Sequence, residues 1–309
     1  MLALSLAVTA LTGDEGVRIG AIGTLPTTPR WWTLWTLPPV ETTGIALVGI
    51  YVLRRAQSGW PRMSGIAGIV VLLVAVGSPI NGMAHDGLLE LHMLQHVLIG
   101  SLGTLLVLVA LPRARAPVRG VRRLISHPAV GFPLWVLSTA VWLWPTVHDQ
   151  LLASNTLWIL QQVSFFVFGV LCWCPILERF APAPEWFRMG WKCGYMICIF
   201  FVGLIIANIY WFSGTPLYPG HAALDATWGI APLRDQANAG TVMMATHCLL
   251  SFVTIAVLFF AGARQEGLEQ RLAEAGVHPD EIREATRSGQ LEALATRSGV
   301  AIATRPGID

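Results

Sequence analysis

The sequence predicts an all-α membrane protein, a polytopic bundle of about seven transmembrane helices. Hydrophobic residues make up 54% of the 309 residues and charged residues only 12%, about half the share of an average globular domain. Uncharged runs such as 65–80 and 97–111, extended by their flanks, approach the roughly 20 residues that cross a bilayer. The small net charge of +2 argues against nucleic acid as a partner.

The seven predicted spans are apolar runs that lie near residues 38–53, 63–80, 88–111, 130–147, 156–177, 190–212 and 237–261. Residues 31–262 therefore form the predicted membrane domain. Residues 1–30 precede it as an extra apolar helix or a signal remnant, although they lack the basic leading region of a secretory signal. Residues 263–309 form a polar tail with predicted helices at 266–275 and 279–298, separated by Gly276 and Pro279.

Arginine and lysine in the short loops predict the orientation. The connections after the first, third and fifth spans hold most of these residues, whereas Arg234 is the exception on the other side. By the positive-inside rule, the N-terminus faces out and the C-terminal tail lies in the cytoplasm. The predicted location is therefore a cytoplasmic membrane that the chain crosses several times.

Histidines and methionines gather toward the predicted outer side. His85, His92 and His96 are spaced by seven and four residues, which places them within roughly 40° of one another on a helix. Imidazole on an apolar helix needs a partner that lipid does not supply. Imidazole with thioether sulfur suits copper, and Cu⁺ better than Cu²⁺. The candidate ligands for this copper site are His92, His96, His247, His85, Met243, Met244 and His148.

Polar side chains near these candidates are expected to hold the second ring nitrogens and to fix the tautomers. They are Gln95, Asp235 and Gln162. Simpler explanations stay open for each residue taken alone, because a histidine can hydrogen-bond within a bundle and a methionine can simply pack. His221 lies in an outer loop rich in proline and glycine, where we expect it to be solvated.

Several of these residues resemble the cytochrome c oxidase assembly factor (CtaG) family of bacterial membrane proteins. The resemblance covers roughly residues 31–262. The matching pieces are Ser78-Pro79-Ile80-Asn81, Leu91-His92-Met93-Leu94-Gln95-His96, Trp144-Pro145 with His148, Trp173-x-Pro175, and Asp235-Gln236 followed by Gly240 and Met243-Met244. Family members usually carry a second His-x-x-x-His element that opens the fifth span. Trp158 and Gln162 stand at those places here, with Gln161 between them, so the chain departs from the family pattern at this point.

The resemblance implies a non-enzymatic assembly factor in the bacterial cytoplasmic membrane. Such a protein would help to insert copper into a subunit of a haem–copper oxidase, with a periplasmic copper chaperone as a further partner. Two other functions stay open. A haem-binding redox protein would use histidines from separate spans as axial ligands. A scaffold for a respiratory complex would use the polar cluster only for packing between spans.

Overall fold

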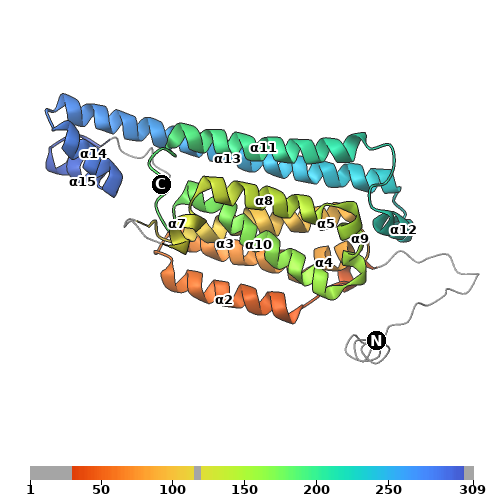
Figure 1. The fold of residues 1–309 in the computed structure, drawn as a ribbon. Coiled ribbons are helices and arrows are strands. Elements are labelled where there is room, and N and C mark those ends of the chain that lie inside the picture. Colours follow the sequence, from red (N-terminus) through yellow and green to blue (C-terminus); the bar gives the residue numbers. More distant parts are fainter. Residues whose placement is uncertain (1–29, 115–119, 303–309) are drawn as a thin grey trace, which may run out of the picture.

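The computed structural model describes residues 30–114 and 120–302, and all regular elements in these ranges are helices. The predicted N-terminal segment therefore lies outside the described residues, apart from Arg30. Most long helices run side by side along one direction (Figure 1). The short helices α4, α9 and α12 lie at one end of this bundle, whereas α7, α14 and α15 lie toward the other.

The long helices are α2 (Pro39–Arg55), α3 (Trp60–Gly77), α8 (Pro128–Trp142), α10 (Asn155–Leu177), α11 (Met189–Phe212) and α13 (Pro232–Glu274). One further rod consists of three consecutive segments, α5 (Leu89–Val97), the π-helical turn η2 (Leu98–Gly103) and α6 (Thr104–Ala110). The short elements are η1 (Trp31–Thr33), α4 (Pro79–His85), α7 (Val121–Ile125), α9 (Pro145–Asp149), η3 (Leu151–Ala153), α12 (Pro219–Trp228), α14 (Pro279–Ser288) and α15 (Leu291–Arg297).

Five helical stretches are long and apolar enough to cross a membrane: Trp60–His85, Leu89–Ala110, Asn155–Leu177, Met189–Phe212 and Pro232–Glu274. A sixth span results if α8 and the segment Pro145–Ala153, which meet at 63°, form one broken span. Helix α2 has 17 residues. Its length is about 25 Å, less than the roughly 30 Å of a hydrocarbon core. The described residues thus support five or six of the seven predicted spans, and the orientation stays a prediction.

Proline and small polar residues decide where helices begin. Pro79 opens α4, and the Ser78 hydroxyl accepts a hydrogen bond from the Ile80 amide, so α3 ends and the chain restarts in a new helix. Ser154 caps the start of α10 in the same way. Pro219 and Pro232 open α12 and α13. These four helices all begin at the end of the bundle where α4, α9 and α12 lie (Figure 1).

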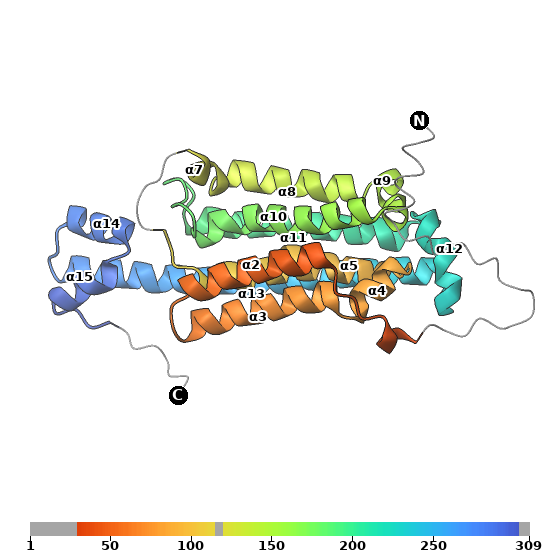
Figure 2. The same ribbon diagram turned by 90° about the horizontal axis from the view of Figure 1, so that it is seen from below.

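Small residues let the central helices approach closely. A Cβ atom on Gly169 would lie 2.1 Å from the Gly100 carbonyl oxygen, so α10 contacts η2 backbone to backbone. Gly131 on α8 meets the Leu171 carbonyl of α10 in a similar way, at 2.3 Å. Such small-residue contacts are typical of helix packing in membranes. Helix α10 therefore lies against α8 on one side and η2 on another (Figure 2).

Helices α11 and α13 pack against each other and lie along one side of the bundle (Figure 1). Helix α13 packs on α5, and it continues to Glu274 without the break predicted near residue 262. Residues 266–274, expected as a separate helix, therefore belong to α13. Beyond Gly276, helices α14 and α15 fold back on the end of α13 around a small apolar cluster that includes Leu272, Ile282 and Leu294.

Candidate metal centre

Three histidines from three separate helices meet at one end of the bundle. They are His92 on α5, His148 on α9 and His221 on α12. One ring nitrogen of each lies within 4.8 Å of those of the other two. All three side chains are buried, with no more than 1% of their surface exposed. The distribution of arginine predicts that this end faces outward.

Each of the three rings has one nitrogen in a hydrogen bond to an oxygen. The bonds are His92 Nε2 to Gln161 Oε1 at 2.9 Å, His148 Nδ1 to the Trp142 carbonyl at 3.0 Å, and His221 Nδ1 to the Gly87 carbonyl at 2.6 Å. A carbonyl oxygen can only accept, so the bonded nitrogen carries the proton and the other nitrogen presents a lone pair. Those other nitrogens have no partner within the described residues.

The spacing of the three nitrogens fits a single metal ion after a small adjustment. Nitrogens bound at about 2.0–2.1 Å to one ion lie about 3.5 Å from each other in a trigonal arrangement. Because the separations do not exceed 4.8 Å, the nitrogens need to approach one another by no more than about 1.3 Å. Hydrogen bonds to the second nitrogen are the usual way in which proteins orient histidine ligands. The arrangement is therefore suited to bind a soft or borderline cation.

A fourth imidazole lies one turn deeper on α5. The His96 ring stacks on Phe165, with ring centroids 4.2 Å apart, and it lies 4.5 Å from the His92 ring. Both His96 nitrogens are buried without a hydrogen-bond partner. His85, at the end of α4, is half-buried, with its ring 5.0 Å from Trp158. Of the predicted ligands, the structure thus brings His92, His96 and His148 together and leaves His85 close by.

His247 lies apart from this cluster. Its Nδ1 donates to the Met243 carbonyl at 2.7 Å, and its ring packs near Trp135 on α8. Asp235 contacts the first residues of α5, so α5 and α13 begin at one level. Counting along the two helices places His247 about 13 Å deeper than His92. Met243 itself lies in an apolar cluster with Met93, and Met244 is half-buried on the same helix.

The polar residues expected to orient the histidines have other partners. Gln95 donates to the Ala75 carbonyl and to Asn81, and Gln162 also donates to Asn81. The Asp235 carboxylate accepts hydrogen bonds from two backbone amides at the start of α5, at 2.6 and 3.0 Å. A carboxylate at a helix N-terminus is electrostatically favourable. It fixes the level of α13 against α5, and so acts on the site indirectly.

The expectation that His221 is solvated is wrong, since its side chain is 1% exposed. The segment after Pro219 folds into α12, which lies across the end of the bundle. The Gly220 amide donates to Asp149 at 3.1 Å, and the Tyr218 hydroxyl donates to the Leu143 carbonyl at 2.9 Å. The proline before a run of helix-forming residues was the available signal for a helix. The burial of His221, however, depends on contacts between this segment and residues more than 70 positions away in the sequence.

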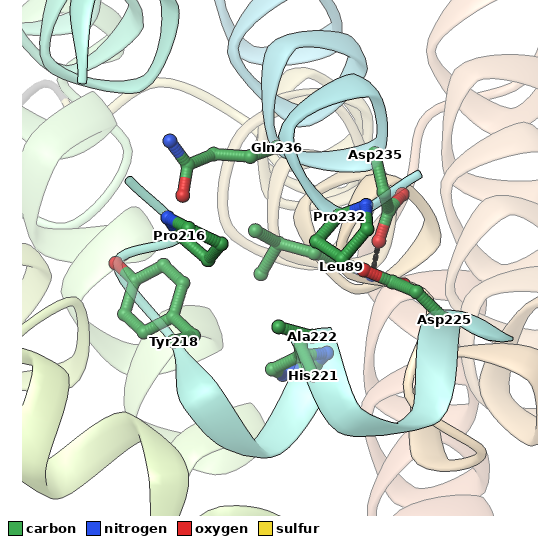
Figure 3. Close-up of a pocket in the computed structure, with 9 residues that line it drawn as sticks. All are labelled: Leu89, Pro216, Tyr218, His221, Ala222, Asp225, Pro232, Asp235 and Gln236. Atoms are coloured by element: carbon green, nitrogen blue, oxygen red, sulfur yellow. Dashed lines mark hydrogen bonds between the residues drawn. The ribbon is translucent and has the colours of Figure 1, made fainter. Parts of the chain in front are cut away.

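A cavity of about 10 Å³, enough for one water-sized occupant, adjoins His221 (Figure 3). Asp225 and Asp235 face one another across one side of it and share a hydrogen bond. Burial, and then the charge of Asp235, raise the pKa of Asp225 to about 7. Burial also lowers the pKa of His221, which favours the neutral ring that a metal needs. Carboxyl groups and an imidazole thus line this small cavity beside the cluster.

Comparison with known proteins identifies the family to which the chain belongs. The family model of the cytochrome c oxidase caa3 assembly factor (Caa3_CtaG) matches residues 46–265, which is well over half of the chain. The match contains all three clustered histidines and ends within α13. No curated protein and no solved structure gives a match. The resemblance inferred from the sequence motifs is therefore confirmed, and the chain belongs to the family of cytochrome c oxidase caa3 assembly factors.

Proposed function

We propose that this chain carries copper on the outer side of a bacterial cytoplasmic membrane and delivers it to a subunit of a caa3-type cytochrome c oxidase. The observation that carries the proposal is the group of three buried imidazoles, His92, His148 and His221. Each has one nitrogen fixed by an oxygen and the other without a partner. Family membership supplies the oxidase as the target. A periplasmic copper chaperone is the expected source of the ion.

The donor set favours Cu⁺ over a divalent ion. Three neutral nitrogens add no negative charge, so a buried divalent ion would keep two uncompensated charges in a region of low dielectric constant. A monovalent ion halves that charge, and imidazole is a suitable ligand for it. The carboxyls that line the cavity, Asp225 and Asp235, are hydrogen-bonded to one another, and the pKa of Asp225 is raised to about 7. Asp149 also lies near His221, but no carboxyl belongs to the group of three histidines.

The geometry also provides a route for release. His92 comes from α5 in the bundle, whereas His148 and His221 come from the short helices α9 and α12 at its end (Figure 1). The His221 ring is held by one hydrogen bond to the Gly87 carbonyl in the turn between α4 and α5. A ligand from a partner that approaches this end can therefore replace His221 or His148, while the His92 imidazole still holds the ion. Stepwise ligand exchange of this kind lets an ion pass between proteins without being free in solution.

The two alternatives fit the site less well. A haem needs a flat slot between its axial ligands, but the His92, His148 and His221 rings lie 4.8 to 5.5 Å apart between centroids, packed against one another. A scaffold without metal would leave three lone pairs buried and unpaired. Each such group costs about 1–3 kcal/mol. A bound ion removes this cost.

The proposal is tested in a strain that lacks the gene. We expect its caa3-type oxidase to retain haem and to lose copper when copper is scarce. Expression of the wild-type chain restores copper in the oxidase, and expression of a variant with His92, His148 and His221 all changed to alanine does not. Restoration by the variant would contradict the proposal. A Soret band in the purified wild-type chain would favour the haem alternative.

A further inference from the structure

The end of the bundle opposite the histidines holds a much larger cavity. Its volume is about 610 Å³. It is lined by the turn between α2 and α3, by residues 109–113 at the end of α6, and by Arg179 just after α10. Several apolar helices end around it, so it lies where the hydrocarbon core gives way to headgroups. The site proposed for copper makes no use of this cavity.

The cavity is basic. Arg113 and Arg179 both line it, and no carboxylate is among the described lining residues. Glu178, the neighbour of Arg179 in the sequence, pairs with the Lys192 ammonium at 3.0 Å. Burial, and then the charge of Arg113, lower the pKa of Arg179 to about 10. The Arg179 guanidinium therefore stays charged near neutral pH, and it lies close enough to Arg113 for the two groups to repel one another.

Arg179 has hydrogen-bonding capacity that the protein does not use. Its Nη1 donates to the Leu111 carbonyl at 2.6 Å, which orients the guanidinium group toward the loop after α6. Its Nε is buried without a partner in the described residues. A buried donor without an acceptor is unfavourable. An anion that accepts from Arg179 and Arg113 would satisfy this donor and neutralise the repulsion between the two cations.

The rest of the wall is suited to an amphiphile. Residues 109–112 are Val, Ala, Leu and Pro, and Trp60 on the opposite side is 73% exposed. Tryptophan at the end of a span marks the headgroup level of a bilayer. Basic pockets between spans on the cytoplasmic side are recognised sites for anionic headgroups. A free inorganic anion would use the arginines but would gain nothing from this apolar wall.

We propose that this cavity binds the phosphate of an anionic phospholipid from the inner leaflet, with Arg113 and Arg179 as the phosphate ligands and Trp60 at the headgroup rim. The lipid joins the turn between α2 and α3 to the ends of α6 and α10. The bound lipid therefore anchors this end of the bundle at a fixed depth. The site lies far from the histidines, so the proposal does not rest on copper binding.

The test is lipid binding to the full-length protein in detergent, followed by native mass spectrometry. We expect one phosphatidylglycerol per chain to bind at concentrations at which phosphatidylcholine does not. Changing both Arg113 and Arg179 to glutamine should weaken phosphatidylglycerol binding by about tenfold or more, since two charged hydrogen-bond donors are lost. The matched control is Arg122→Gln with Arg123→Gln, which removes the same charge from exposed positions on α7. This control should keep the wild-type affinity.

Three outcomes would overturn the proposal. They are equal binding of the two lipids, an undiminished preference in the Arg113 and Arg179 double variant, and an equal loss in the α7 control. A thermal unfolding experiment with inorganic phosphate alone distinguishes a lipid headgroup from a free anion as the ligand. If phosphate protects the chain against heat as well as phosphatidylglycerol does, the site takes a free anion and the lipid assignment is wrong. Should the double variant fail to fold, Arg113→Gln alone decides, because Arg113 is exposed and donates no hydrogen bond found in the described residues.

Discussion

The two ends of the bundle differ in the sign of the charge that they can accept. At the histidine end, ring nitrogens of three imidazoles lie within 4.8 Å of one another, and the carboxyls of Asp225 and Asp235 line a small cavity beside His221. At the other end, Arg113 and Arg179 face a cavity of about 610 Å³ without a carboxylate in its described lining. The same apolar helices connect both ends. Both proposed sites therefore lie at helix ends, where the chain leaves regular hydrogen bonding, and the packed middle of the bundle keeps these ends in place.

In the middle of the bundle, close packing between helices keeps the two ends in position. Two residues after His96, the chain enters the π-helical turn η2, and the Trp173 indole donates to the Ser101 carbonyl in that turn at 3.1 Å. Gly100 in η2 lets α10 come into backbone contact at Gly169. π-helical turns occur often beside functional sites. Here the turn sets how α5, with its two histidines, faces α10, which carries Gln161.

The largest expected effect separates the two ends. Changing both His92 and His148 to alanine should remove nearly all copper from the purified protein, because a single imidazole of the three remains. Phosphatidylglycerol binding at the other end should be unchanged. Elemental analysis and native mass spectrometry on the same sample measure both. Loss of both properties together would mean that the variant is misfolded or that the ends are not independent.

A smaller effect concerns how the histidine end is oriented. Gln161→Leu removes the acceptor for His92 Nε2, and loss of such an outer partner typically lowers metal affinity by about 10–100-fold. Gln162→Leu is the matched control, because Gln162 is the next residue on α10 and donates to Asn81 instead. Copper affinity measured by competition with a chelator distinguishes the two. Equal losses in both variants would show that the amides act on packing and not on His92.

The smallest expected effect is a dependence on pH at the lid that α12 forms. The pKa of Asp225 is about 7 in the folded chain, above the value near 3.9 of an unfolded aspartate. The folded state therefore binds this proton more tightly, and its contribution to stability decreases as the pH rises from about 4 to 7. His221, with a lowered pKa, acts in the opposite direction.

The difference between the wild type and Asp225→Asn isolates the carboxyl, since His221 is common to both proteins. The variant should gain melting temperature relative to the wild type between pH 5.5 and pH 8 in metal-free samples. Thermal unfolding at both pH values gives this difference. A gap between the two proteins that does not change with pH would contradict the raised pKa of Asp225.

The positions of the helices along the chain were largely predictable from the sequence. The depth at which a given side chain lies in the bundle was not. The run expected at 156–177 is α10 (Asn155–Leu177), because apolar length and a serine cap are local signals. The joint placement of His92 and His96 followed from helical periodicity. The position of His247 did not, since periodicity gives the face of a helix but not its level against a neighbour. That level is fixed by Asp235 at the start of α5.

His221 illustrates the other limit of the sequence. Composition marked its surroundings as a loop, and nothing local indicates burial. The side chain is covered only because Gly220 and Tyr218 bond to α9 and to the end of α8, contacts that join distant parts of the chain. The structure also shows what replaces the His-x-x-x-His element of the family pattern, at the positions of Trp158 and Gln162. The Trp158 ring packs 4.6 Å from His92, and it thus forms a wall of the site.

The most direct measurement compares copper content in two single variants, His221→Gln and His247→Gln. Both residues are buried histidines with one nitrogen bonded to a backbone carbonyl, so they are closely matched. The account predicts that His221→Gln loses most of its copper and that His247→Gln keeps the wild-type amount. Full copper in His221→Gln, with loss in His247→Gln, would contradict the three-histidine site.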